Sequence, residues 1–352
     1  MDLEQNNNQS GPTEPQPSEP IPGVSQSGPP AKTPRKGSGW RIFWGIILAL
    51  SVMANIALFL MLMGVIALFA TGSRGILTEE VIRKGPRKNK IAVISVEGII
   101  YGEQAKNVYR QLNAARQDRS VKGLIVRVNS PGGTISGSDQ IYREILKYRK
   151  ETGKPVIAFM QGVAALGGYY TSVACQKIIA EPTTITGSIG VISWYFVVKE
   201  LLEKKLGILP VVVKSGEKKD WPSSFEEPNE VHRQYIQDKL IKPAFERFVK
   251  VVAEGRKESL TLEKIRELAD GSIYGAEEAK KEKLIDDIGY LDDAIELVKS
   301  LAGIDRARVV QYRKPFSLTS FLSYRKPNFL KIDRTTLYEL STPQVLYLWS
   351  AY

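Results

Sequence analysis

The chain has 352 residues, a formal net charge of +11, one cysteine and one histidine. A single cysteine excludes an internal disulfide, and His232 alone excludes both a histidine-based catalytic triad and a multi-histidine metal site. The Lys and Arg residues are spread along the chain and no nucleic-acid motif accompanies them. The charge therefore indicates a basic surface near anionic lipid and not a nucleic-acid-binding protein.

The N-terminal part of the chain divides into two segments by composition. Residues 1–39 are rich in Gln, Asn, Ser, Gly and Pro, so we expect a disordered polar tail. Residues 40–72 contain an uncharged apolar run long enough to cross a hydrocarbon layer of ~30 Å, with Trp40 and Trp44 as interfacial anchors at its start. A cleaved signal peptide would have a shorter apolar core nearer residue 1, so this segment is predicted to be a transmembrane helix.

Three further segments follow the apolar run. Residues 73–89 are expected to form a basic linker, 90–302 a folded domain, and 303–352 a C-terminal extension that ends in an apolar cluster at 345–349. Basic residues flank both ends of the predicted transmembrane helix, so the charge distribution does not decide its orientation.

Short apolar runs alternate with helical patterns in the first half of the domain. The predicted strands are 91–100, 123–128, 156–160 and 177–180, with helices at 104–116 and 138–150 between the first three. This order indicates parallel strands joined by helical crossovers, an α/β fold. The later patterns predict a helix at 197–206, a strand at 209–214, and amphipathic helices at 230–255, 262–269 and 292–302.

Two glycine-containing turns follow predicted strands. In the sequence from Asn129 to Thr134, Pro131 fixes one dihedral, and Gly132 and Gly133 let backbone amides point outward, as an oxyanion site requires. An ordinary strand-to-helix turn has the same signature. Residues 162–174 turn into a helix with paired glycines, a favourable place for a nucleophile.

Two polar segments could supply a general base. Lys218 and Lys219 lie in a loop after a predicted strand, and a lysine shielded from water can act as a base. Adjacent loop lysines are more often solvent-facing. The hydroxyl of Ser188, in the turn 186–191, would either orient such a lysine or cap its own turn.

Together these motifs resemble the signal peptide peptidase A (protease IV) family of membrane-bound serine-lysine peptidases, which has a Clp protease/crotonase-like fold. The matching residues are Val128-Asn129-Ser130-Pro131-Gly132-Gly133, Gly167-Gly168-Tyr169-Tyr170, Thr186-Gly187-Ser188-Ile189-Gly190-Val191, and Lys214-Ser215-Gly216 with Lys219-Asp220. The resemblance runs from about residue 90 to 292. It implies a spiral of βα units followed by C-terminal helices, and none of the motifs requires a metal ion or an organic cofactor.

The resemblance also implies a role for each site residue. Lys219 would be the general base, Ser188 would orient it, and the amides of Gly133 and Gly167 would form the oxyanion hole. The family's nucleophilic serine precedes the Gly-Gly-Tyr-Tyr sequence, and Leu166 stands at that position.

Three functions follow as hypotheses. The first is serine-type hydrolysis of apolar leader peptides, impaired by Leu166; the second is a non-catalytic peptide-binding scaffold; the third is a peptidase that uses Ser188. A crotonase-type acyl-CoA enzyme would leave the membrane anchor and the Lys219 motif without a role.

The resemblance extends to partners and location. It implies peptide or signal-peptide remnants as ligands, contact with membrane lipid, and a homo-oligomeric ring in which Ser and Lys come from neighbouring subunits. The predicted helix 230–255 is a candidate assembly surface. We expect a single-pass protein of the cell membrane whose peptidase-like domain is extracytoplasmic.

Overall fold

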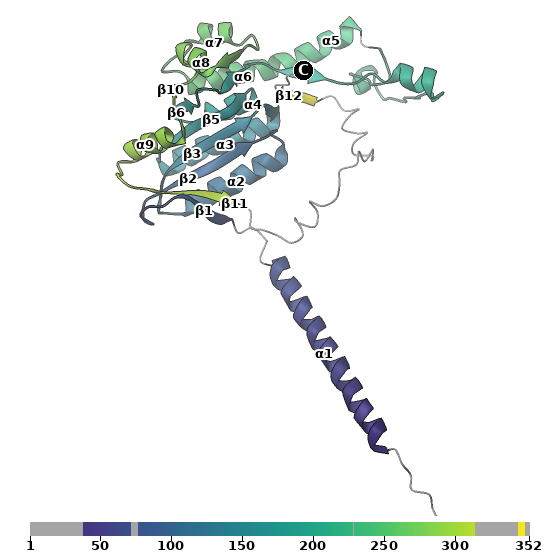
Figure 1. Cartoon of the computed structure of the whole chain (residues 1–352). Helices are drawn as coiled ribbons and strands as arrows, with labels where there is room; N and C mark the ends of the chain where they lie inside the picture. Colours follow the sequence, from purple (N-terminus) through teal and green to yellow (C-terminus); the bar gives the residue numbers. More distant parts are fainter. Residues whose placement is uncertain (1–37, 72–76, 228, 314–343, 349–352) are drawn as a thin grey trace, which may run out of the picture. The chain divides into compact units, whose positions relative to one another are not determined.

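The structure is a computed structural model that describes residues 38–71, 77–227, 229–313 and 344–348 (Figure 1). The chain divides into two compact units, Met1–Ile66 and Ala67–Tyr352. The polar tail expected at the N-terminus lies almost entirely outside the described residues.

Helix α1 (Ser38–Thr71) confirms the predicted apolar helix. Its stretch Gly39–Ala67 has a mean hydropathy of 2.6 over 29 residues, and none of its most apolar window is buried inside the protein. At 1.5 Å per residue the stretch is ~44 Å long, more than the hydrocarbon layer requires. It is the one candidate membrane span among the described residues.

The second unit is built on a nine-stranded sheet, and the parallel α/β fold is confirmed. The main strand order is β1-β11-β2-β3-β5-β6-β10; β7 pairs with β5, and β9 with β7. The strands are β1 (Thr78–Arg83), β2 (Lys90–Glu97), β3 (Val121–Ser130), β5 (Val156–Ala165), β6 (Lys177–Ala180), β7 (Ile185–Gly187), β9 (Ile273–Gly275), β10 (Asp287–Ile288) and β11 (Arg308–Arg313). Only β1 and β9 run antiparallel to their neighbours in this sheet.

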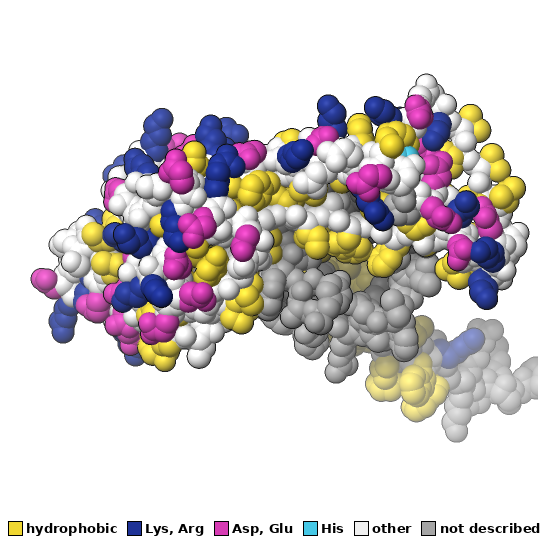
Figure 2. Space-filling view, turned by 90° about the horizontal axis from the view of Figure 1, so that it is seen from above, with side chains coloured by type: hydrophobic (Ala, Val, Ile, Leu, Met, Phe, Trp, Pro, Cys, Tyr) yellow, Lys and Arg dark blue, Asp and Glu magenta, His cyan; other side chains and the backbone are white. Residues whose placement is uncertain are grey.

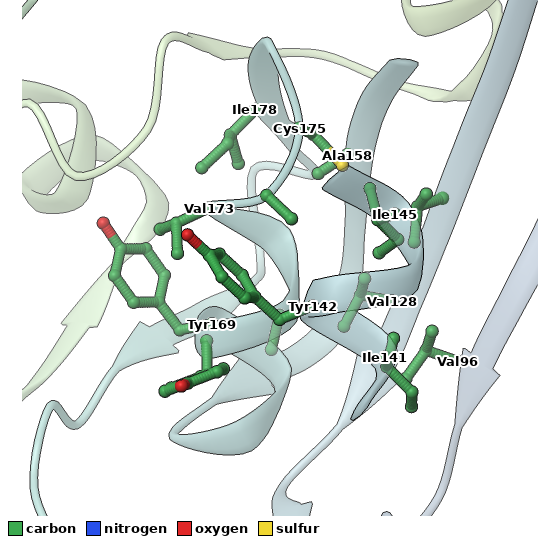
Figure 3. Close-up of a cluster of buried hydrophobic side chains, with 14 of the residues drawn as sticks. Val96, Val128, Ile141, Tyr142, Ile145, Ala158, Tyr169, Val173, Cys175 and Ile178 are labelled. Carbon is green, nitrogen blue, oxygen red and sulfur yellow. The ribbon is translucent and has the colours of Figure 1, made fainter. Parts of the chain in front are cut away.

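Helices cover both faces of the sheet, as expected for βα crossovers (Figure 1). They are α2 (Gly102–Gln117), α3 (Ile135–Thr152), α4 (Gly167–Ser172), α5 (Glu230–Ile236), α6 (Lys242–Gly255), α7 (Leu262–Leu268), α8 (Ala276–Lys281) and α9 (Leu291–Ala302). Successive strand side chains point to opposite faces, so β2 contributes Ile94 and Val96 to the core with α2 and α3, and Ile91 to the core with α9. Figure 3 shows Ile141 and Ile145 of α3 within the first of these clusters.

The helix predicted at 197–206 is present as a shorter segment, residues 199–205, most of which is the π-helical turn Leu201–Lys205. The strand predicted at 209–214 is wrong. Residues 209–214 form no strand, and the side chains of Val211 and Val213 are 79% and 94% exposed. An apolar β-branched run looks the same whether it is buried in a sheet or left on the surface, so periodicity could not separate the two cases.

The longest predicted helix, 230–255, is present as α5, a π-helical turn Gln237–Ile241, and α6 in succession. Helices 104–116, 138–150, 262–269 and 292–302 are confirmed with small changes at their ends.

The expected basic linker needs a correction, because residues 78–83 within it form strand β1. This strand pairs with β11, which lies in the expected C-terminal extension. β1 is an edge strand with Glu79, Glu80 and Arg83 among its six residues, so it has no apolar run that would reveal it.

A second, three-stranded sheet is formed by β4 (Gly132–Thr134), β12 (Gln344–Leu348) and β8 (Ile192–Trp194). The C-terminal strand β12 lies in the middle and is antiparallel to both neighbours. In Figure 1 this strand is the yellow arrow near α4 and α6.

The single cysteine is buried beside α3 and α4 (Figure 3). Cys175 is 4% exposed, and burial raises the pKa of its thiol to about 12. Because the thiolate is the reactive form, we expect the native chain to resist iodoacetamide at pH 8 and to react after unfolding in guanidinium, as read by mass spectrometry. An exposed control, Glu267→Cys, should be labelled at once. Rapid labelling of native Cys175 would contradict its burial.

Candidate functional site

Leu166 and Ser188 lie side by side at the ends of two parallel strands. β5 and β7 are in register with Ala165 opposite Gly187, so the next residue of each strand leaves the sheet at the same place. The Leu166 N–H donates to the Gly187 carbonyl at 3.0 Å. The structure therefore brings together the expected nucleophile position and the expected lysine-orienting serine.

The backbone of Leu166 is strained. Its φ of 46° and ψ of −109° lie outside the regions that leucine favours, which costs on the order of 1–3 kcal/mol. Leu166 caps the N-terminus of α4 and is 5% exposed, packed in the main core. A strained residue at a strand-to-helix turn is the geometry that exposes a nucleophile in hydrolases, and here it holds a hydrocarbon side chain.

Two glycines let α4 approach the turn between β3 and β4. A Cβ on Gly167 would lie 2.5 Å from Ser138 Oγ and 3.2 Å from the Gly133 nitrogen, and one on Gly168 would lie 2.7 Å from Ser130 O. Only glycine permits this contact. The close approach places Gly133 and Gly167, both expected to supply oxyanion amides, next to each other.

The amide of Gly133 faces the C-terminal strand. The Gly132 carbonyl accepts from Ile100 N–H and the Thr134 N–H donates to the Ile100 carbonyl, each at 2.8 Å. Because peptide groups alternate sides along an extended strand, the N–H and C=O of Gly133 point the other way, towards Tyr347 of β12. The expected oxyanion donor is thus engaged by the chain's own tail.

Gly133→Ala is expected to destabilise the fold. A Cβ there would lie 2.2 Å from the Ile100 carbonyl oxygen, and the backbone must shift to accommodate it. We expect a loss of about 2–4 kcal/mol, measured as a fall in Tm of the full chain in detergent. Gly102→Ala is the matched control, because nothing lies within 4 Å of its Cβ position. Equal Tm values for the two variants would contradict the close approach of β4 to Ile100.

A cavity of about 490 Å³ opens beside Leu166 and Ser188. Its lining is mainly apolar, with Asp270, Gln237 and Lys242 as polar members; the apolar side includes Val191, Ile192, Ile241, Phe245 and Ala269. Such a cavity suits an apolar side chain of an extended ligand.

The hydroxyl and the backbone N–H of Ser188 both donate hydrogen bonds to backbone carbonyls. Its Oγ donates to the Gly271 carbonyl at 3.0 Å and its N–H to the Ser272 carbonyl at 2.7 Å. Its φ of 48° is positive and its side chain is buried. The acceptors come from the turn before β9, which no motif in the sequence had singled out.

Lys219 lies in an exposed 3-10 turn, Glu217–Asp220, within the loop after residue 214, and is absent from the cavity lining. Residues on both sides of Lys219 make contacts within the loop. Lys214 Nζ contacts Asp220 Oδ1 at 2.8 Å, and Lys218 Nζ lies 5.6 Å from the ring centroid of Trp221. The hydrogen bond from Lys214 lowers the pKa of the Asp220 carboxyl. Within the described part of one chain, Lys219 does not meet Ser188 or Leu166, so its role as a base stays a prediction that requires a neighbouring subunit.

The slot between β4 and β8 has the form of a peptide groove. β12 fills it with Leu346 opposite both Thr134 and Ile192, and the Leu346 side chain is 2% exposed. Addition of a strand between two free edges is a common mode of peptide recognition. The apolar cluster 345–349 was the sequence signal, but its partners in space could not be inferred from it.

The described residues contain no group of three or more His, Cys, Asp and Glu side chains that could hold a metal ion.

Residues 148–305 match the family model described as peptidase family S49. A protein of Enterococcus faecium provisionally named signal peptide peptidase SppA is 37% identical over 248 residues, which cover 67% of this chain and 71% of the relative. The chain belongs to the signal peptide peptidase A family.

Two longer relatives in this family are similar over a shorter share of their length. The chloroplastic serine protease SPPA of Arabidopsis thaliana is 34% identical over 235 residues, 66% of this chain and 34% of the relative. Protease 4 of Haemophilus influenzae is 36% identical over 230 residues, 63% of this chain and 36% of the relative. These relatives and the apolar helix α1 fit a membrane-anchored member of the family with its Clp protease-like fold.

Proposed function

We propose that this S49 family member binds extended apolar peptides in the groove between β4 and β8 without cutting them by the family's route. The observation that carries the proposal is Leu166, which occupies the strained turn beside the paired glycines Gly133 and Gly167.

Hydrolysis needs a nucleophile within about 3.5 Å of an aligned carbonyl, and a leucine side chain has no atom that can attack. Loss of a catalytic nucleophile typically costs several orders of magnitude in rate, even where the rest of the site persists. The parts that persist here are those that bind: the edges of β4 and β8, the glycine turn whose Gly133 amide faces the strand between them, and an apolar cavity.

Strand β12 supports the proposal by its place in the groove. Its main chain pairs with both edges, and Leu346 is the side chain taken up between them. We expect a ligand to run in the same direction as β12. Its main-chain hydrogen bonds would give affinity, and the site at the Leu346 position would select peptides that carry an apolar side chain there.

A ring of identical subunits belongs to the same proposal. Residues 192–213 carry many large exposed apolar side chains, including Val211 and Val213, more than an isolated soluble surface ordinarily leaves uncovered. Figure 2 shows hydrophobic side chains along the middle of the upper face and over the part that extends to the right. A neighbouring copy packed there would bring its Lys219 into range, with the domains held beside membrane lipid on the extracytoplasmic side.

A second candidate is a peptidase that uses Ser188. It is favoured by the cavity that Ser188 shares with Leu166. Against it stands the hydrogen bond from Ser188 Oγ to the Gly271 carbonyl, which must break before the oxygen can attack.

One experiment separates the two candidates. The full chain in lipid vesicles is incubated with a fluorescent leader peptide, and the peptide is recovered for mass spectrometry. We expect saturable binding with the peptide returned intact, and the same result for Ser188→Ala. Cleavage products that disappear in Ser188→Ala would overturn the scaffold proposal and establish the serine as nucleophile.

A further inference from the structure

Helix α1 carries one amide side chain near its middle. Asn55 lies about midway along the uncharged run between Arg41 and Arg74, among leucine, isoleucine and methionine side chains. Its Nδ2 donates to the Ser51 carbonyl at 2.7 Å. No other partner of this amide is found among the described residues.

The hydrocarbon layer makes such a residue costly. A primary amide has two donor hydrogens and an oxygen with two acceptor positions, and one internal hydrogen bond uses one of these four. Lipid tails offer no partner for the rest, so the amide is satisfied only by another polar group at the same depth.

A second copy of the chain can supply that group. All copies of a single-span protein insert in one direction, which puts every Asn55 at the same depth. Two parallel helices can then exchange hydrogen bonds between their Asn55 amides.

The apolar pattern around Asn55 supports a helix pair. Residues spaced three and four apart lie on one face of a helix, and the face of Asn55 includes Ser51 and Leu58 one turn away, with Leu48 and Leu62 two turns away. Leu48, Asn55 and Leu62 are seven residues apart, the repeat of a left-handed helix pair, in which one buried Asn fixes the register. These leucines are more than half exposed on the isolated helix.

We propose that α1 self-associates as a parallel pair through Asn55, with Leu48, Ser51, Leu58 and Leu62 at the interface. This contact lies within the apolar helix, and it is independent of whether the folded domain binds or cleaves peptides. Asn55 is the specificity-determining residue of the contact.

Cysteine cross-linking of the full chain in phosphatidylcholine vesicles tests the proposal. The natural Cys175 is buried and is replaced by serine in all variants. Leu58→Cys places a thiol on the proposed face, and Met53→Cys places one on the opposite face, ~7.5 Å away along the helix axis and still within the apolar run. We expect several-fold more disulfide-linked dimer for Leu58→Cys. Adding Asn55→Leu to it should reduce the dimer about tenfold, whereas Asn55→Gln, which keeps an amide, should retain most of it.

Equal yields at the two positions would overturn the proposal. So would an unchanged yield in Asn55→Leu, which would mean that the folded domains alone bring the copies together. Carbonate extraction of each variant is the insertion control, and release of the unmodified chain from the vesicles would remove the physical basis of the pair.

Discussion

Leu166→Ser is expected to cleave an apolar leader peptide at least about a thousandfold faster than the unmodified chain. The strained turn already holds residue 166 beside the glycine amides of Gly133 and Gly167, so a serine Oγ there would meet the remaining parts of the family's site. The measurement is the appearance of new peptide termini, followed over time with the full chain in vesicles.

Two matched variants show whether the gain comes from the hydroxyl. Leu166→Ala removes the same buried hydrocarbon, with a similar stability cost of about 2–4 kcal/mol, but adds no oxygen, and it should stay inactive. Leu166→Ser combined with Lys219→Ala should lose most of the gain, because the serine then lacks its base. Equal activity of Leu166→Ser with and without Lys219 would contradict the assignment of the base, and activity of Leu166→Ala would contradict the role of position 166.

Removal of β12 is expected to strengthen peptide binding about a hundredfold. A strand tethered to its own groove competes at an effective concentration in the millimolar range, and a free peptide must displace it from both β4 and β8. A chain that ends at residue 343 presents both edges unpaired. The measurement is the Kd for a fluorescent apolar peptide by anisotropy.

A point substitution provides the matched test of the same idea. Leu346→Asp puts a carboxylate where the side chain is 2% exposed, and the cost of burying that charge should expel the strand. A chain that ends after Leu348 keeps β12 and should bind as the full chain does. If neither the shortened chain nor Leu346→Asp binds more tightly, β12 does not compete for the groove.

The sequence predicts those strands and helices whose burial requires a clear pattern of apolar residues. β2, β3 and β5 are covered on both faces, so their runs are almost wholly apolar, and the helices between them repeat every three to four residues. β1 escaped prediction because an edge strand held by backbone pairing needs no apolar side chains. The strand predicted at 209–214 is wrong for the opposite reason, because its apolar side chains lie exposed on the surface.

The parts of the candidate site also differ in how far the sequence predicts them. The glycine turns that hold Leu166 and Ser188 are recognisable in the sequence, but the pairing of β5 with β7 that brings the two residues together is not, because the three-residue strand β7 is too short to leave a pattern. The pairing of Ser188 with Lys219 depends on a loop that leaves the domain, and its partner cannot be inferred from local pattern. The contact of β12 with Gly133 joins residues about two hundred positions apart, a distance at which no periodicity carries information.

The central claim is that the unmodified chain has no working nucleophile, and a fluorophosphonate probe tests it most directly. The full chain in vesicles is treated with the probe, and its intact mass and tryptic peptides are determined, with Leu166→Ser as the reactive reference. We predict an unchanged mass for the unmodified chain and a single adduct on the variant. A covalent adduct on any hydroxyl of the unmodified chain, above all on Ser188, would contradict the account.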